Sequence, residues 1–128
     1  MISHIHVGIA EYDRAMAFYS VVLAALGLES KFADREKGWA GWMSPGVDRP
    51  LFLIGLPFDR RPATAGNGQM VALLACDRAT VNLCHALALT NGGSDEGAPG
   101  IRAHYYGAYF RDPDGNKIAV CCHDPVSD

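Results

Sequence analysis

Apolar residues near the N-terminus recur at every second position, which is the pattern of a strand with one face in the core. In residues 4–9 these are Ile5, Val7 and Ile9. We expect them to face the core and His4 and His6 to share the opposite face. From Asp13 the apolar spacing changes to three or four residues, and Gly27 stands where a helix would end. The pattern therefore predicts a strand followed by an amphipathic helix of about four turns.

The second half of the chain repeats this order. Residues 69–74 form a short apolar run suited to a buried strand, Asp77 can cap a helix, and Gly92-Gly93 can end it. An offset of 66 residues aligns His4 with Met70, Tyr19 with His85, Gly27 with Gly93, and Leu53 with Ala119. We therefore predict one α+β domain over residues 1–128, made of two diverged βαβββ modules at about 1–60 and 67–124.

Further strands are indicated by aromatic or aliphatic runs at 39–42, 51–54, 104–110 and 117–121. The sequence Asp112-Pro113-Asp114-Gly115-Asn116 is a turn between the last two of these runs. Residues 59–68 are polar and rich in Gly and Pro, so they are predicted to join the modules.

Composition and net charge limit the classes of partner that we expect the chain to bind. The chain has 49% apolar and 20% charged residues and a net charge of -3, which is ordinary for a globular domain and disfavours nucleic acid and anionic membranes. No segment resembles a signal peptide or a membrane span, so a cytoplasmic location is expected. The four cysteines have neither zinc-site nor disulfide-scaffold spacing, and we expect reduced and mostly buried thiols.

Four ordered motifs carry a resemblance to a known family: Ile2-Ser3-His4-Ile5, Ala17-Phe18-Tyr19 with Leu26-Gly27, Gly97-Ala98-Pro99-Gly100, and Arg111-Asp112-Pro113-Asp114-Gly115-Asn116. With them the chain resembles the vicinal oxygen chelate superfamily, which includes glyoxalase I, bleomycin-resistance proteins, fosfomycin-resistance proteins and extradiol dioxygenases. The resemblance implies two βαβββ modules whose mixed sheet curls around a small-molecule cleft. It also implies a homodimer in which a second chain completes that cleft.

The resemblance implies a divalent metal at positions that correspond to His4, Leu53, Met70 and Ala119. Only His4 is an ordinary ligand, because Met70 offers a soft thioether and the other two side chains offer no donor. We therefore expect no metal site of the family type and no cofactor. A divalent metal stays open if His6 or His104 supplements His4.

The candidate binding residues lie on strands that the resemblance places around the cleft: His4, His6, Trp42, Met70, His104, Tyr106, Ala119 and Cys121. Core packing is the alternative for Trp42 and Tyr106. Cys121 lies in an apolar strand that would leave its thiol inert. No catalytic residue can be assigned.

Three functions follow. The first is a glyoxalase/bleomycin-resistance-like protein that binds a small molecule without a metal. The second is a metal-dependent lyase or isomerase resembling glyoxalase I (lactoylglutathione lyase), or a dioxygenase-like enzyme. The third is a metal-free enzyme that uses His104 and Tyr106, which we expect on one face of a strand, for proton transfer.

Overall fold

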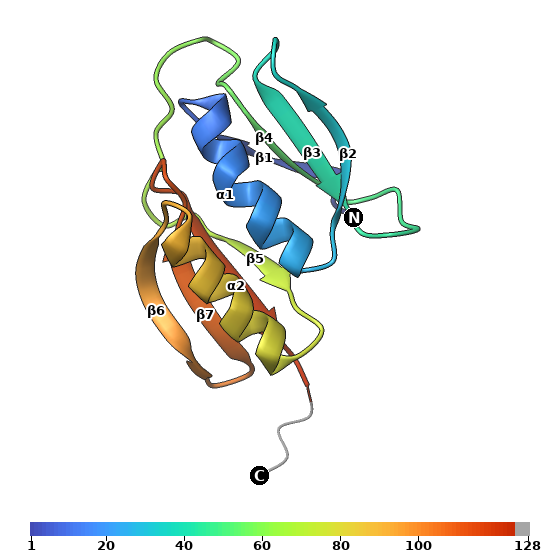
Figure 1. Cartoon of the computed structure of the whole chain (residues 1–128), viewed down its shortest axis with the longest axis vertical. Helices are drawn as coiled ribbons and strands as arrows, with labels where there is room; N and C mark the ends of the chain where they lie inside the picture. Colours follow the sequence, from blue (N-terminus) through green and yellow to red (C-terminus); the bar gives the residue numbers. More distant parts are fainter. Residues whose placement is uncertain (125–128) are drawn as a thin grey trace.

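The computed structural model describes residues 1–124 and shows two βαβββ modules (Figure 1). The first contains β1 (His4–Gly8), α1 (Tyr12–Ala25), β2 (Glu29–Asp34), β3 (Trp39–Met43) and β4 (Leu51–Gly55). The second contains β5 (Val71–Leu74), α2 (Arg78–Thr90), β6 (Ser94–Ile101), β7 (Tyr106–Arg111) and β8 (Lys117–Cys122). The predicted α+β class and the duplicated layout are confirmed. Within the described residues no helix is long and apolar enough to span a membrane.

Each module forms its own four-stranded mixed sheet. The strand orders are β1-β4-β3-β2 and β5-β8-β7-β6, and in each sheet the first pair is parallel while the other pairs are antiparallel. His4 pairs with Leu51 in the first sheet and Val71 pairs with Ile118 in the second. Neither sheet closes into a barrel, so β1 and β5 are free edges of their sheets.

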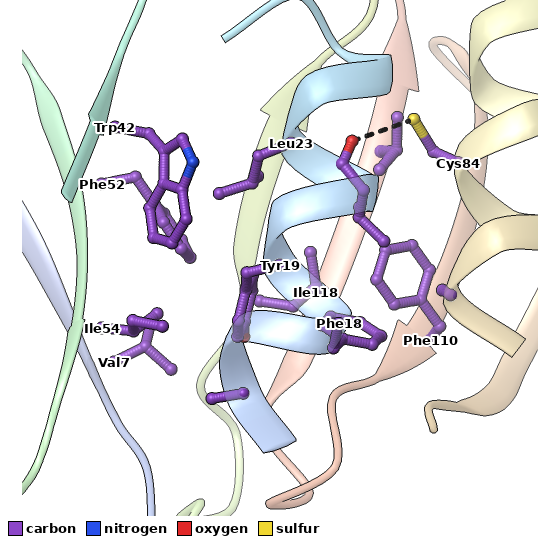
Figure 2. Close-up of a cluster of buried hydrophobic side chains, with 14 of the residues drawn as sticks. Val7, Phe18, Tyr19, Leu23, Trp42, Phe52, Ile54, Cys84, Phe110 and Ile118 are labelled. Carbon is purple, nitrogen blue, oxygen red and sulfur yellow. Dashed lines mark hydrogen bonds between the residues drawn. The ribbon is translucent and has the colours of Figure 1, made fainter. Parts of the chain in front are cut away.

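Helix α1 is shared by the cores of both modules. Figure 2 shows Tyr19 and Leu23 pointing from α1 toward the first sheet, while Phe18 points the other way, toward the second module. The ring centroids of Tyr19 and Phe52 are 5.4 Å apart, and those of Phe18 and Phe110 are 5.9 Å apart. Both α1 rings are almost fully buried. One helix therefore provides apolar surface that both sheets cover.

The helix ends follow the predicted signals. Gly27 has a φ of 84° just after α1, and Gly92 has a φ of 101° just after α2, in the left-handed region that glycine adopts without steric cost. Asp77 caps α2, because its carboxylate accepts a hydrogen bond of 2.8 Å from the Thr80 amide.

Two edge strands were not located by the sequence patterns. β2 and β6 have mostly exposed or half-buried side chains and contain register shifts against their neighbours. Edge strands without a fully buried face lack the alternation that marks a strand. The Gly97–Gly100 motif lies inside β6.

The turn at residues 112–116 ties the second module to α1. The Tyr19 hydroxyl donates a buried hydrogen bond of 2.5 Å to Asp112 Oδ2. The other Asp112 oxygen accepts from the backbone amides of Asp114 and Asn116 at 2.8 and 2.9 Å, which fixes the turn. Burial, with Asp112 beside the ring, raises the pKa of Tyr19 well above its usual value, so the phenol remains a donor.

The same turn reaches the strand-to-helix connection of the first module. Asp114 Oδ1 accepts hydrogen bonds from the Ala10 amide at 3.0 Å and from the Arg14 guanidinium at 2.8 Å. The Asn116 side-chain amide donates to the Gly8 carbonyl at 2.9 Å. We call this set of contacts between residues 112–116 and the first module the turn clamp.

Tyr19→Phe should lower the free energy of unfolding by about 1–3 kcal/mol, because it removes a buried donor from a carboxylate. Tyr106→Phe is the control, since its hydroxyl donates an exposed hydrogen bond to Asn82 and should cost less than about 0.5 kcal/mol. Urea unfolding measures both. If both variants lose the same free energy of unfolding, the role given to the turn clamp is contradicted.

Candidate functional site

His6 lies on the face of the first sheet that α1 does not cover. Its neighbour Val7 packs into the core, and the strand alternation turns His6 outward. A Cβ atom on Gly55 would lie 2.8 Å from His6 Nε2 and 3.1 Å from the Cβ of Trp39. The imidazole therefore occupies space beside Trp39 that is open only because residue 55 is glycine.

An open cavity of about 910 Å³ begins at this imidazole. It is lined by His6 and Gly8 of β1, by Lys37 and Trp39, and by the connection at residues 56–64. The Trp39 ring lies 4.7 Å from the Phe32 ring, which supports it from β2, and 38% of Trp39 remains exposed. The volume is in the range of small-molecule sites. We call it the β1 cavity.

Two smaller cavities lie between the modules. One of about 300 Å³ separates the edges of β1 and β5 and brings His6 and Met70 to the same space. The other, of about 350 Å³, is lined mainly by apolar side chains, including Trp42 and Leu73. His6 is therefore shared by the β1 cavity and the cavity between the sheet edges.

The other predicted residues of the first module have different positions. His4 is exposed, lies on the same face of β1 as His6, and is hydrogen-bonded through Nδ1 to the Ser3 hydroxyl at 3.0 Å. Trp42 is 4% exposed and lies near Tyr19 in the core, with ring centroids 6.3 Å apart. Packing in the core, the alternative given for Trp42 in the sequence analysis, accounts for most of its side chain. Only a small part of the Trp42 surface lines the apolar cavity.

Ala119 and Cys121 lie on the outward face of the second sheet. They pair with Tyr109 and Gly107 of β7, and they line none of the three cavities given above. Burial raises the pKa of the Cys121 thiol, which disfavours a reactive thiolate. The predicted common cleft of His4, His6, Met70, Ala119 and Cys121 is therefore not one of these cavities.

Tyrosines that the sequence interpretation passed over occupy that second face. The hydroxyls of Tyr105 and Tyr109 are hydrogen-bonded to each other, and this bond is the main cause that raises the pKa of Tyr105 to about 12. The Arg102 guanidinium lies over the Tyr109 ring, 5.4 Å from its centroid. The available signal was their spacing, since each tyrosine lies two residues from Gly107.

The prediction that His104 and Tyr106 share a strand face is wrong. β7 begins at Tyr106, so His104 lies in the bend before the strand and is exposed. Tyr106 packs on the α2 side, and its hydroxyl donates to Asn82 Oδ1 at 2.6 Å. The bend interrupts the alternation from which the shared face was inferred.

The donor set does not fit the metal of the resembled family. Leu53 and Ala119 present only aliphatic side chains at the corresponding positions, and Met70 presents a thioether. Within residues 1–124 no three side chains of His, Cys, Asp or Glu are grouped so that they could hold an ion. The described residues therefore offer no donor set from which a metal-dependent step could be derived.

His6 is one of the titratable groups that line the β1 cavity. Partial burial, and to a lesser extent the nearby His4, lower its pKa below 6.5. The imidazole is therefore neutral at pH 7 and can both donate and accept a hydrogen bond.

Two βαβββ modules with sheets left open on one side define the class of fold, and the sequence identifies the family within it. The profile of the Glyoxalase/Bleomycin resistance protein/Dioxygenase superfamily matches residues 1–120. The chain belongs to this superfamily.

Solved structures agree with this assignment. A glyoxalase/bleomycin resistance protein from Albidiferax ferrireducens T118 is 34% identical, with a TM-score of 0.84 over 95% of this chain and 98% of that chain. TnmS3, an antibiotic binding protein from Streptomyces sp. CB03234, is 21% identical, with a TM-score of 0.68 over 97% and 96% of the two chains. A glyoxalase-related enzyme from Fulvimarina pelagi is 16% identical, with a TM-score of 0.75 over 99% and 92%. No curated protein matches the chain.

His4→Gln should raise the pKa of His6 toward its usual value, because it removes a like charge and leaves the burial unchanged. NMR titration of the imidazole proton shifts measures the change. His123→Gln is the control, since the His123 ring lies beside Tyr105 of the second module, with ring centroids 5.5 Å apart, and the change should leave the His6 titration unaltered. A His6 titration that is the same in wild type and His4→Gln would contradict the assigned proximity.

Proposed function

We propose that this protein binds a small organic molecule in the β1 cavity and does so without a metal ion. The observation that carries the proposal is the cavity itself, which places the neutral imidazole of His6 beside the exposed face of Trp39. A polar group that both donates and accepts, next to an aromatic surface, is a common arrangement in ligand sites.

Two further observations support the proposal. The positions at which the resembled family holds its metal carry aliphatic or thioether side chains in this chain. A protein of the same fold is also named for binding: TnmS3, an antibiotic binding protein. Fold alone does not assign an activity, so the argument depends on the cavity and its side chains.

The metal-dependent alternative, a lyase, isomerase or dioxygenase, would require His6 or His104 to join His4. His4 and His6 do lie on one face of β1, but His104 is exposed in the bend before β7. Two imidazoles bind a divalent ion weakly compared with a set of three or four donors. No observation favours this alternative, and the absent third donor is the reason we place it second.

Titration with 8-anilino-1-naphthalenesulfonate, a fluorescent aromatic probe, tests the proposal. We expect saturable binding that is unchanged by EDTA. Gly55→Ala should weaken it by about tenfold, or about 1.4 kcal/mol, because the new methyl group displaces the His6 ring. Gly97→Ala is a matched control: its methyl group would meet Tyr109 Cδ2 at 2.9 Å on the second sheet, away from the cavity.

Binding that disappears with EDTA would contradict the metal-free part of this proposal. Binding that is lost in Gly97→Ala but kept in Gly55→Ala would place the site on the second sheet instead. Absence of saturable binding would contradict the proposed function as a whole. Urea unfolding of both variants shows whether a loss of binding comes from a loss of the folded state.

We also propose a homodimer in the cytoplasm. Large apolar side chains are exposed at the strand edges and termini of the single chain, among them Leu74 at 72% and Ile101 at 64%. Leu74 lies at the end of β5, a free edge of the second sheet, and paired subunits would cover such open edges.

Light scattering at micromolar concentration should therefore give twice the chain mass of 13.8 kDa. Leu74→Lys should shift the equilibrium toward the monomer, because it introduces a charge into the covered surface. A wild-type monomer at this concentration would contradict the dimer. If the Leu74→Lys variant remains as dimeric as the wild type, β5 is not part of the interface.

A further inference from the structure

The β1 cavity has a charge opposite to that of the whole molecule. Its lining contains three cationic side chains, Lys37, Arg60 and Arg61, and one carboxylate, Asp59. The chain as a whole has a net charge of -3. A concave surface lined by one sign of charge concentrates ligands of the other sign, so this cavity favours anions over cations.

These three cations have no carboxylate partner within 4 Å in the described part of the chain. Four other arginines do have one: Arg14 pairs with Asp114, Arg35 with Asp13, Arg78 with Asp124 and Arg111 with Glu96. The Asp59 carboxylate forms no ion pair with these cations, and its Oδ1 accepts a hydrogen bond of 3.0 Å from the Arg61 backbone amide. The charges of Lys37, Arg60 and Arg61 are therefore available to a ligand.

The backbone at Arg60 has an unusual conformation. Its φ is 63°, and among residues 1–124 it is the one non-glycine residue in the left-handed region. Such a conformation costs free energy at a side chain that is neither Gly, Asn nor Asp. The Arg60 amide closes the turn on the Pro57 carbonyl at 3.0 Å. A strained arginine kept at the wall of a cavity is typical of a residue that positions a binding group.

Aromatic side chains lie on the same cavity as the cations. Trp39 is held in place by Phe32 behind it, and Phe58, from the connection between the modules, is fully exposed. A fully exposed phenylalanine gains nothing from the core. Two rings beside one opening form a surface against which a flat ligand can pack.

We propose that the ligand of the β1 cavity is a planar aromatic molecule with an anionic group such as a carboxylate, sulfonate or phosphate. The ring packs against Trp39 and Phe58, and the anionic group is bound by Lys37, Arg60 and Arg61. This inference rests on the proposed function and adds to it the chemical class of the ligand. Guanidinium groups suit such anions because they donate paired hydrogen bonds in one plane.

A matched pair of fluorescent probes tests the charge preference. 8-Anilino-1-naphthalenesulfonate and N-phenyl-1-naphthylamine share one aromatic skeleton, and only the first carries a sulfonate. We expect the sulfonate probe to bind at least about tenfold more tightly at low salt. We also expect added sodium chloride to reduce this preference, because salt screens charges at an open cavity.

Paired charge variants locate the preference. The double variant Arg60→Gln with Arg61→Gln should lose most of the advantage of the sulfonate probe and should leave the neutral probe unchanged. The double variant Lys31→Gln with Arg35→Gln removes the same charge from exposed positions outside the cavity lining and should leave both affinities unchanged. Circular dichroism and urea unfolding confirm that each variant is folded.

Each outcome bears on a separate claim. Equal affinity of wild type for the two probes would overturn the anionic ligand and leave the proposed function in place. Equal effects of the two double variants would also overturn it, since the preference would then come from the overall charge of the protein. Absence of binding by either probe would contradict the proposed function as well.

Discussion

The buried hydrogen bond between the Tyr19 hydroxyl and the Asp112 carboxylate is the contact on which the rest of the structure depends. It joins a residue of α1 to a turn of the other module, and that turn also holds the Ala10 amide, Arg14 and the Gly8 carbonyl. A buried carboxylate costs much free energy unless donors surround it. Asp112 is 3% exposed and accepts from Tyr19, Asp114 and Asn116, so its full set of donors is present only when both modules are in place.

This clamp explains where cavities form. It fixes β1 through the Gly8 carbonyl and places the edges of β1 and β5 on either side of a cavity that contains both His6 and Met70. Because α1 and α2 pack into one core with the inner faces of the two sheets, the opposite faces of the sheets stay uncovered by these helices. On the first of these faces Gly55 leaves room for the His6 ring, and the connection at 56–64 provides the outer wall. The site is therefore a consequence of how the modules are joined.

Much of the fold could be predicted from the sequence because its signals are local. Strand alternation identified the face of β1, glycines marked the helix ends, and the offset of 66 residues revealed the duplication. β2 and β6 could not be located, since edge strands do not bury a continuous face. The resemblance singled out residues 111–116, but its motif does not show that Asp112 binds Tyr19, which requires the tertiary structure.

The candidate site was predicted only in part. His6 and Met70, two of the residues expected to border one cleft, line a common cavity, whereas Tyr106 faces α2 on the same side of β7 as Ala108 and Phe110. The cations of the β1 cavity were not identified. Lys37 follows β2 while Arg60 and Arg61 belong to an irregular connection, and no periodic pattern relates positions that meet only after folding.

The central claim is that the family fold has been kept while binding takes place at the β1 cavity and not at the inherited metal positions. The most direct test is to map the sulfonate probe on the ¹⁵N-labelled protein by NMR in the presence of EDTA. We predict that the largest shifts fall on the Trp39 indole and on the amides of Gly55, Arg60 and Arg61. Shifts concentrated instead around Met70, Ala119 and Cys121 would contradict the account.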